Sequence, residues 1–276
     1  MINQSKRPEH LPDFVKPPLN EVVLGVQFAP PQGYHQLLAY KVWELFKTDY
    51  PLLQELPAIP PAFETFGLPQ PGSIGHNFNF GIVTGAVHDR FWFLRESQDE
   101  LIQFQNDRLL HNWRKVGDQT NEYPRFEKMI ASFESELLRL QAFAESLVPQ
   151  TLAINQCEVS YINQISDASA SSTKSADWLK FLSLDDKVVE DFSGSFREII
   201  RSSEGKPLGR LTCDASSGFD TLGHKIIALN LTVRGTPSSP NIASALEFLK
   251  KGREHIVSKF AELTTESAHA KWGRRK

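Results

Sequence analysis

The chain has 276 residues and a formal net charge of −3, from 30 Lys and Arg against 33 Asp and Glu. This balance argues against a globally basic nucleic-acid binder, although it leaves room for a local basic patch. Hydrophobic residues make up 40% of the chain and charged residues 23%, which excludes a disordered or membrane-embedded protein.

The first half opens with a polar, proline-bearing arm over 1–18. Six prolines between Pro51 and Pro71 predict an irregular excursion over the surface. Short connections make the strands of this half an antiparallel meander. Apolar spacing and β-branched content predict a strand at 21–28, a helix at 34–46, strands at 78–87, 91–95, 101–105 and 108–116, and a helix that begins near Asn121.

The second half begins with a strand and a Ser/Ala/Thr-rich connector over 167–175. Ser175 is placed to cap the short helix that follows. Pro240 suits the first turn of the final helix. The predicted elements are a strand at 154–165, a short helix at 176–183, strands at 195–202, 208–215 and 224–234, and a helix at 240–266.

The two long helices carry the same apolar ladder, with spacings of four and three residues, which Arg253 alone interrupts. Each half therefore follows the plan strand, helix, about three antiparallel strands and long helix. The sequence predicts an α+β fold of pseudo-duplicated β-α-β-β-β-α units over 1–150 and 151–276, with antiparallel sheets each covered by a long helix. The sheets can be continuous or packed as a pair, and the alternative is one irregular sheet without duplication.

Signatures of catalysis are missing from the sequence. There is no phosphate loop, no His-Glu-x-x-His pair and no Gly-x-Ser-x-Gly elbow. Cys157 and Cys213 each lie in an apolar stretch, which predicts reduced core thiols. We expect no metal and no cofactor, and the balance leans against an enzyme. Without a secretory signal or an 18-residue apolar run, we expect a cytoplasmic protein that makes no membrane contact.

Arginines and asparagines gather on one face of the predicted strands in both halves. Arg108, Asn112 and Arg114 share a face, since they are separated by even numbers of residues. Guanidinium forks bind carboxylates and phosphates, so these residues are candidates for a binding surface. A structural network between the halves would use the same residues, and that alternative stays open. The predicted binding residues are Arg108, Asn112, Arg114, Arg210, Asn230, Arg234 and Trp272.

Two stretches of the sequence look familiar. They are the opening PPLNEVVLGVQF over 17–28 and the meander motif QNDRLLHNWR over 105–114. Together they resemble a sporadically distributed family of uncharacterised bacterial proteins of about this length. The likeness covers most of the chain, including the late Trp272. The resemblance implies an accessory role such as toxin–antitoxin or phage-defence (antiviral) systems, and it implies no catalytic residue.

Three functions follow from these observations. The first is a non-enzymatic binding protein that docks a protein partner or a second copy of itself. The second is a nucleic-acid-binding component, which would use the aromatic and arginine-rich run over 90–95 and the basic C-terminal segment around Trp272, residues 271–276. The third is a small-ligand protein or enzyme with a pocket between a helix and the sheet. We favour the first, because the sequence names no nucleophile and no acid–base pair.

Overall fold

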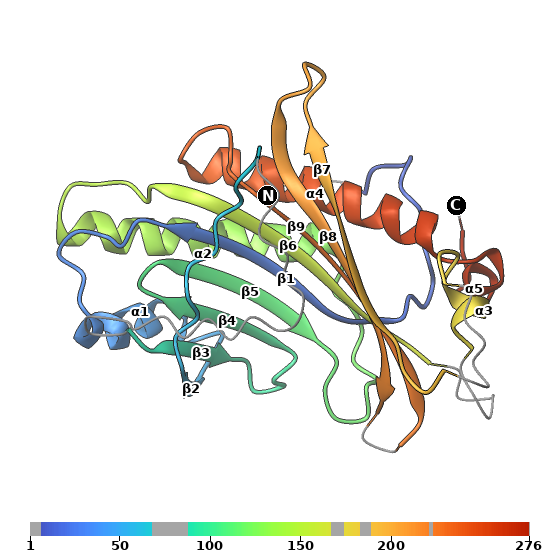
Figure 1. The fold of residues 1–276 in the computed structure, drawn as a ribbon. Helices are drawn as coiled ribbons and strands as arrows, with labels where there is room; N and C mark the ends of the chain where they lie inside the picture. The colour runs from blue at the N-terminus through green and yellow to red at the C-terminus, as the bar shows by residue number, and fades with distance from the viewer. Residues whose placement is uncertain (1–6, 68–87, 167–173, 183–188, 221–222, 276) are drawn as a thin grey trace.

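The computed structural model describes residues 7–67, 88–166, 174–182, 189–220 and 223–275. Within them, nine strands form one antiparallel sheet in the order β2-β3-β4-β5-β1-β6-β9-β8-β7 (Figure 1). The strands are β1 (Leu19–Phe28), β2 (Leu52–Leu56), β3 (Arg90–Leu94), β4 (Glu100–Gln105), β5 (Arg108–Arg114), β6 (Ile154–Ile165), β7 (Ser193–Arg201), β8 (Pro207–Phe219) and β9 (Lys225–Gly235). The α+β class is confirmed, and the strands of both halves share one sheet.

The two halves join where β1 pairs with β6. Leu24 lies opposite Val159 in this antiparallel pairing. Side chains alternate between the two faces of a strand, and along β1 Val22, Leu24 and Val26 are buried against the helices. We call this side of the sheet the helix face. The opposite side, on which Gln27 lies, is the open face.

Both long helices lie on the helix face (Figure 1). The helices are α1 (Ala39–Phe46), which follows the short 3-10 turn η1 (Gln36–Leu38), α2 (Phe126–Leu147), α3 (Ser175–Trp178), α4 (Ile242–Leu263) and α5 (Glu266–Lys271). α2 packs on β1 and β5, and α4 packs on β6 and β9. Arg253, the charged residue in the apolar ladder of α4, is buried, and its Nη2 lies 2.6 Å from Oε1 of Glu127 on α2. This ion pair joins the two helices.

Two expectations for the first half need correction. The proline-rich stretch contains a strand, β2, because Pro51 and Pro57 lie just outside it and an edge strand bonds on one side only. α2 begins at Phe126, later than predicted, because Arg125 has a φ of 76° and cannot be helical. The predicted strand at 78–87 and the connector at 167–173 lie outside the described residues.

Helix boundaries in the second half also differ from the prediction. The short helix is only α3, and its cap residue is Lys174, so Ser175 lies inside it. α4 is capped by the Asn241 side chain, which accepts a hydrogen bond from the Ser244 amide at 2.9 Å. α4 ends at Leu263, slightly before the predicted end, and a further helix that was not predicted, α5, follows with the Thr265 hydroxyl as its cap.

The N-terminal arm packs onto the C-terminal end of the chain. Leu11 and Phe14 are buried, and the Phe14 ring meets those of Phe260 and Trp272 edge-on. Phe14 also pairs with Arg274 in an isolated β-bridge. The N-terminal arm is therefore part of the core through its apolar residues Leu11 and Phe14.

Candidate functional site

An irregular segment crosses the open face of the sheet. Residues 57–67, which we call the strap, leave the end of β2 and run across the strands (cyan in Figure 1). Along the strap, successive residues bond to side chains of β4, β1, β6 and β8. The strap is thus oriented across the strands, without a backbone ladder to any of them.

Three glutamine side chains hold the strap by its backbone. Gln105 accepts a hydrogen bond from the Ile59 amide at 2.9 Å and donates one to the Ile59 carbonyl at 3.1 Å. Gln27 pairs in the same way with Ala62, at 2.9 and 2.5 Å. Gln156 accepts from the amide of Glu64 at 3.3 Å. These contacts use main-chain groups that every residue except proline possesses.

The spacing of these contacts requires an extended strap. Two strand steps separate β4 from β1, or about 10 Å at the usual distance between neighbouring strands. The three residues from Ile59 to Ala62 span about 10 Å when extended. Pro57, Pro60 and Pro61 favour this conformation because their φ is fixed. From Pro61 to Phe66, residues alternate between exposed and half-buried positions.

Glu64 anchors the far end of the strap. Its Oε2 accepts a hydrogen bond from Nε of Arg210 at 2.7 Å, and its Oε1 lies 3.9 Å from Nη1 of Arg234. Arg210 also donates to the Thr65 carbonyl at 2.8 Å and lies over the Phe66 ring. The Glu64 side chain is only 12% exposed, so two arginines hold its carboxylate in a partly desolvated position.

Two cavities flank the strap on the open face. The larger, of about 480 Å³, lies beside Phe63 and Glu64. Its sheet side is lined by Arg197, Arg210, Thr212, Asp214, Thr232 and Arg234. A smaller cavity of about 130 Å³ lies between the strap and the strands near Arg108. The strap therefore does not fill the open face, and cavities lined by polar side chains of the sheet remain beside it.

Six of the seven residues predicted from sequence lie on the open face. Arg210 and Arg234 are opposite each other in the pairing of β8 and β9. Arg234 donates from Nε to Oε2 of Glu158 at 2.7 Å. The side-chain oxygen of Asn230 is buried without a hydrogen-bond partner. The structure thus brings Arg210 and Arg234 together at the larger cavity, and it places Asn230 opposite Asp214, which lines that cavity.

The three predicted residues on β5 have separate partners, and Asn112 belongs to a second polar row. Asn112 donates to Glu21 at 2.6 Å and accepts from Gln103 at 3.0 Å, and Gln103 accepts from Arg90 at 2.9 Å. This row crosses β1, β5, β4 and β3. Arg108 makes two bonds to the Asp107 carboxylate, at 2.9 and 3.1 Å. Burial and the nearby charge of Arg108 lower the pKa of Arg90.

Arg114 lies beside Trp92, the half-exposed tryptophan of the open face. Its guanidinium is 5.3 Å from the centre of the Trp92 ring, and that of Arg90 is 5.6 Å from it. Arg114 also donates to the Gln98 carbonyl at 3.1 Å. The neighbours of Trp92, Phe91 and Phe93, point to the helix face and are buried. Trp92 is thus the one aromatic residue of the run over 90–95 on the open face, and its ring is in contact with two arginines.

Trp272, the seventh predicted residue, is placed in the core. It is 7% exposed, and its ring stacks on Trp178 at 5.7 Å and packs against Phe260 at 5.2 Å. The basic segment around it suggested an exposed position, but the packing of α5 against the arm buries the ring. Trp272 therefore does not belong to the open face.

Sequence reasoning missed a buried polar cluster on the helix face. His111 is fully buried, and its Nδ1 lies 3.0 Å from the Glu136 carboxylate, which accepts a second bond from Tyr50 at 2.9 Å. Burial alone would lower the pKa of His111, but Glu136 and Glu100 outweigh it and the pKa is raised. Within the described residues, no hydroxyl or thiol bonds to His111, so it forms no nucleophile–base pair.

Other reactive groups of the described residues are enclosed. Cys157 and Cys213 are free and buried, as predicted, and burial raises the pKa of both thiols. The Thr264 hydroxyl lies 2.7 Å from Nε2 of His269 but is fully buried and bonds to a backbone carbonyl. No group of three or more potential ligands is placed to hold a metal ion in the part of the chain that is described.

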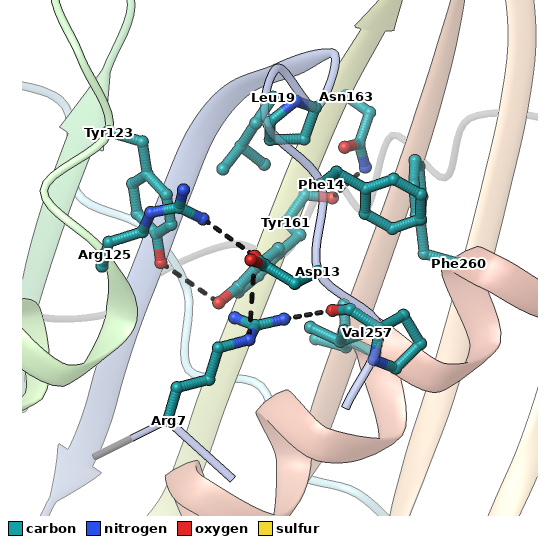
Figure 2. A pocket seen from close by; sticks show the side chains of 13 residues that line it. Arg7, Asp13, Phe14, Leu19, Tyr123, Arg125, Tyr161, Asn163, Val257 and Phe260 are labelled. Carbon is teal, nitrogen blue, oxygen red and sulfur yellow. Dashed lines mark hydrogen bonds and ion pairs between the residues drawn. The ribbon is translucent and has the colours of Figure 1, made fainter. Parts of the chain in front are cut away.

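A further cavity lies on the helix face, under the N-terminal arm (Figure 2). The hydroxyls of Tyr123 and Tyr161 meet there at 3.2 Å. Asp13 lies between two arginines, 3.8 Å from Arg7 and 3.4 Å from Arg125. The cavity has about 50 Å³, enough for a few water molecules. It is therefore too small for an organic ligand.

Comparison of the chain with protein-family models, with curated proteins and with solved structures found no match. The family resemblance therefore stays a prediction. Among the described residues, no helix combines the length and the apolar character needed to cross a membrane.

Proposed function

We propose that the chain is a non-enzymatic protein-binding module, and that its open face is the surface that binds an extended polypeptide segment. The observation that carries this proposal is the set of glutamine side chains that pair with the strap backbone. Gln105 and Gln27 each match both hydrogen-bonding groups of one strap residue. Such pairing recognises an extended chain by its main chain, as strand-addition partners are recognised.

The charge distribution on the open face supports a protein partner over a nucleic acid. On the sheet itself, Arg234 is paired with Glu158, and Asp214 lines the same cavity. Carboxylates in these positions repel phosphates. The Trp92 ring is already in contact with two guanidinium groups, which argues against base stacking.

The strand order supports the predicted duplication. In the first half β3, β4, β5 and β1 are neighbours, and in the second half β7, β8, β9 and β6 follow the same order. The first strand of each half pairs with the last one, and β1 meets β6 at the centre. We propose that the units over 1–150 and 151–276 are repeats of one plan. A defence role and a cytoplasmic location stay predictions from the sequence.

The test uses a variant in which residues 58–66 are replaced by a Gly/Ser linker of equal length. A fluorescent peptide with the sequence of the strap, PAIPPAFETFG, is titrated with this variant while anisotropy is recorded. We expect saturable binding in the micromolar range. Gln27→Ala in the same variant should weaken it about tenfold or more, because two hydrogen bonds of about 1 kcal/mol each are lost.

The matched control is Gln54→Ala, which removes an exposed glutamine of the edge strand β2. This substitution should leave the affinity unchanged. A folded variant, verified by circular dichroism, that does not bind the peptide would contradict the proposal. Binding of a single-stranded DNA or RNA 20-mer that weakens steeply with salt would favour the nucleic-acid function instead.

A further inference from the structure

We propose that the partner of the open face is an extended protein segment with a carboxylate side chain at the place of Glu64, and that this segment displaces the strap. This inference rests on the proposed function. It adds the chemistry of the partner and the way in which the strap regulates access to it.

Glu64 is the one charged residue of the strap. Hydrogen bonds at Ile59, Ala62, the Glu64 amide and the Thr65 carbonyl use the strap main chain, and the Phe66 ring lies under the Arg210 guanidinium. The Glu64 carboxylate faces both Arg210 and Arg234 and is largely withdrawn from solvent. Charge-assisted bonds between arginine and carboxylate are stronger and more selective than neutral ones. An occupant that replaces the strap must therefore supply an anion here.

The lining of the larger cavity reinforces this requirement. Its sheet side presents Arg197, Arg210 and Arg234 against Asp214, and Glu158 beside Arg234 adds a second carboxylate, so three arginines face two carboxylates. Arg197 is exposed and makes no ion pair within the described residues. When Glu64 leaves, this lining has an excess of positive charge. A neutral segment would leave Arg210 without its partner, which costs more than an unmade neutral bond.

The strap is attached in a way that allows its replacement. Phe63, its largest outward side chain, is 52% exposed, and the three prolines carry no amide hydrogen to bond the sheet. Its polar contacts with the sheet are ones that another extended chain can reproduce, and none of its side chains belongs to the buried core. Segments of this kind belong to the least stable parts of a protein.

The experiment compares three peptides on the strap-replaced variant described above. They have the strap sequence, the strap sequence with Glu64→Gln, and the strap sequence with Phe63→Ala as the matched control at an outward position. We expect the Gln peptide to bind about 10- to 100-fold more weakly, as loss of a charge-assisted bond predicts. The Ala peptide should differ by about twofold at most, because Phe63 is exposed.

Substitution of the protein gives the reciprocal measurement. Arg210→Gln should weaken the Glu peptide and bring its affinity to that of the Gln peptide. If the Glu and Gln peptides bind with equal affinity to the variant with Arg210 intact, the proposal that the partner needs a carboxylate is overturned. The proposal that the open face binds peptides would still hold. If the Arg210→Gln variant still prefers the Glu peptide over the Gln peptide by the full factor, Arg210 is not the residue that recognises the carboxylate. Failure of all three peptides to bind a folded variant would contradict the proposed function itself.

Discussion

Gln27→Ala in the intact chain should release the centre of the strap. Gln27 makes two hydrogen bonds to Ala62, one to its amide and one to its carbonyl. At about 1 kcal/mol for each bond, the free energy of opening falls by about 2 kcal/mol, which is about 30-fold in the opening equilibrium. The strap amides should exchange with deuterium faster by about this factor, which mass spectrometry of peptides from 57–67 measures.

The same measurement on Gln54→Ala serves as the control, since that glutamine is exposed on β2. Exchange in the β1 and β6 peptides should stay slow in both variants, which shows that the sheet itself is intact. Unchanged exchange of the strap in Gln27→Ala would refute the reasoning, because the paired amide could then not be what holds the segment.

Three further predictions concern the helix face. Because Glu136 raises the pKa of His111 despite burial, which alone would lower it, the charged imidazole stabilises the fold at low pH. This stability is fully present below about pH 6.5 and is lost as the pH rises through the raised pKa. In thermal melts of the unsubstituted protein, Tm should therefore fall over that pH range, and His111→Gln should make this fall smaller. An unchanged dependence of Tm on pH in His111→Gln would contradict the prediction. Arg253→Met should lower the free energy of unfolding in urea by about 3–5 kcal/mol, since Glu127 loses its partner, and Glu127→Gln should restore part of it; full additivity would show that the ion pair is not coupled. Gly252→Ala places a Cβ 2.7 Å from a β6 side chain and should cost about 1–3 kcal/mol, whereas an unaffected Tm would contradict the close approach of α4.

Strands and long helices were predictable because their apolar periodicity records which face is buried. The strand predicted at 154–165 is found as β6 with the same bounds, and β9 alternates between buried and half-buried residues from Ile227 to Gly235. The sequence does not decide whether the halves build one sheet or two. That depends on the pairing of β1 with β6, strands about 130 residues apart, and an alternating pattern does not specify the neighbour of a strand.

The strap could not be predicted from the sequence. Gln27, Gln105 and Gln156 follow the same polar alternation as any solvent-facing strand residue. Their side-chain amides bind the main chain of the strap. The side chains of the strap therefore need no regular pattern from which its position could be predicted. Glu136 was missed for a related reason: it lies beside the apolar ladder of α2 and is buried by its contact with His111.

The position of the arginines of the second half could be predicted from the sequence, because an even spacing places residues on one face of a strand. Arg210 and Arg234 lie together on the open face. Trp272 was assigned from its basic neighbours, yet aromatic packing decides its position. Charge in a terminal segment therefore says less about exposure than the ring contacts do.

The central claim is that the strap and the partner occupy the same face. Its most direct test compares the affinity of the strap peptide for the intact chain and for the strap-replaced variant. If the strap is closed by at least about 2 kcal/mol, the intact chain is competent in only a few per cent of molecules and should bind at least about 30-fold more weakly. Equal affinities would show that the peptide binds elsewhere and would contradict the account.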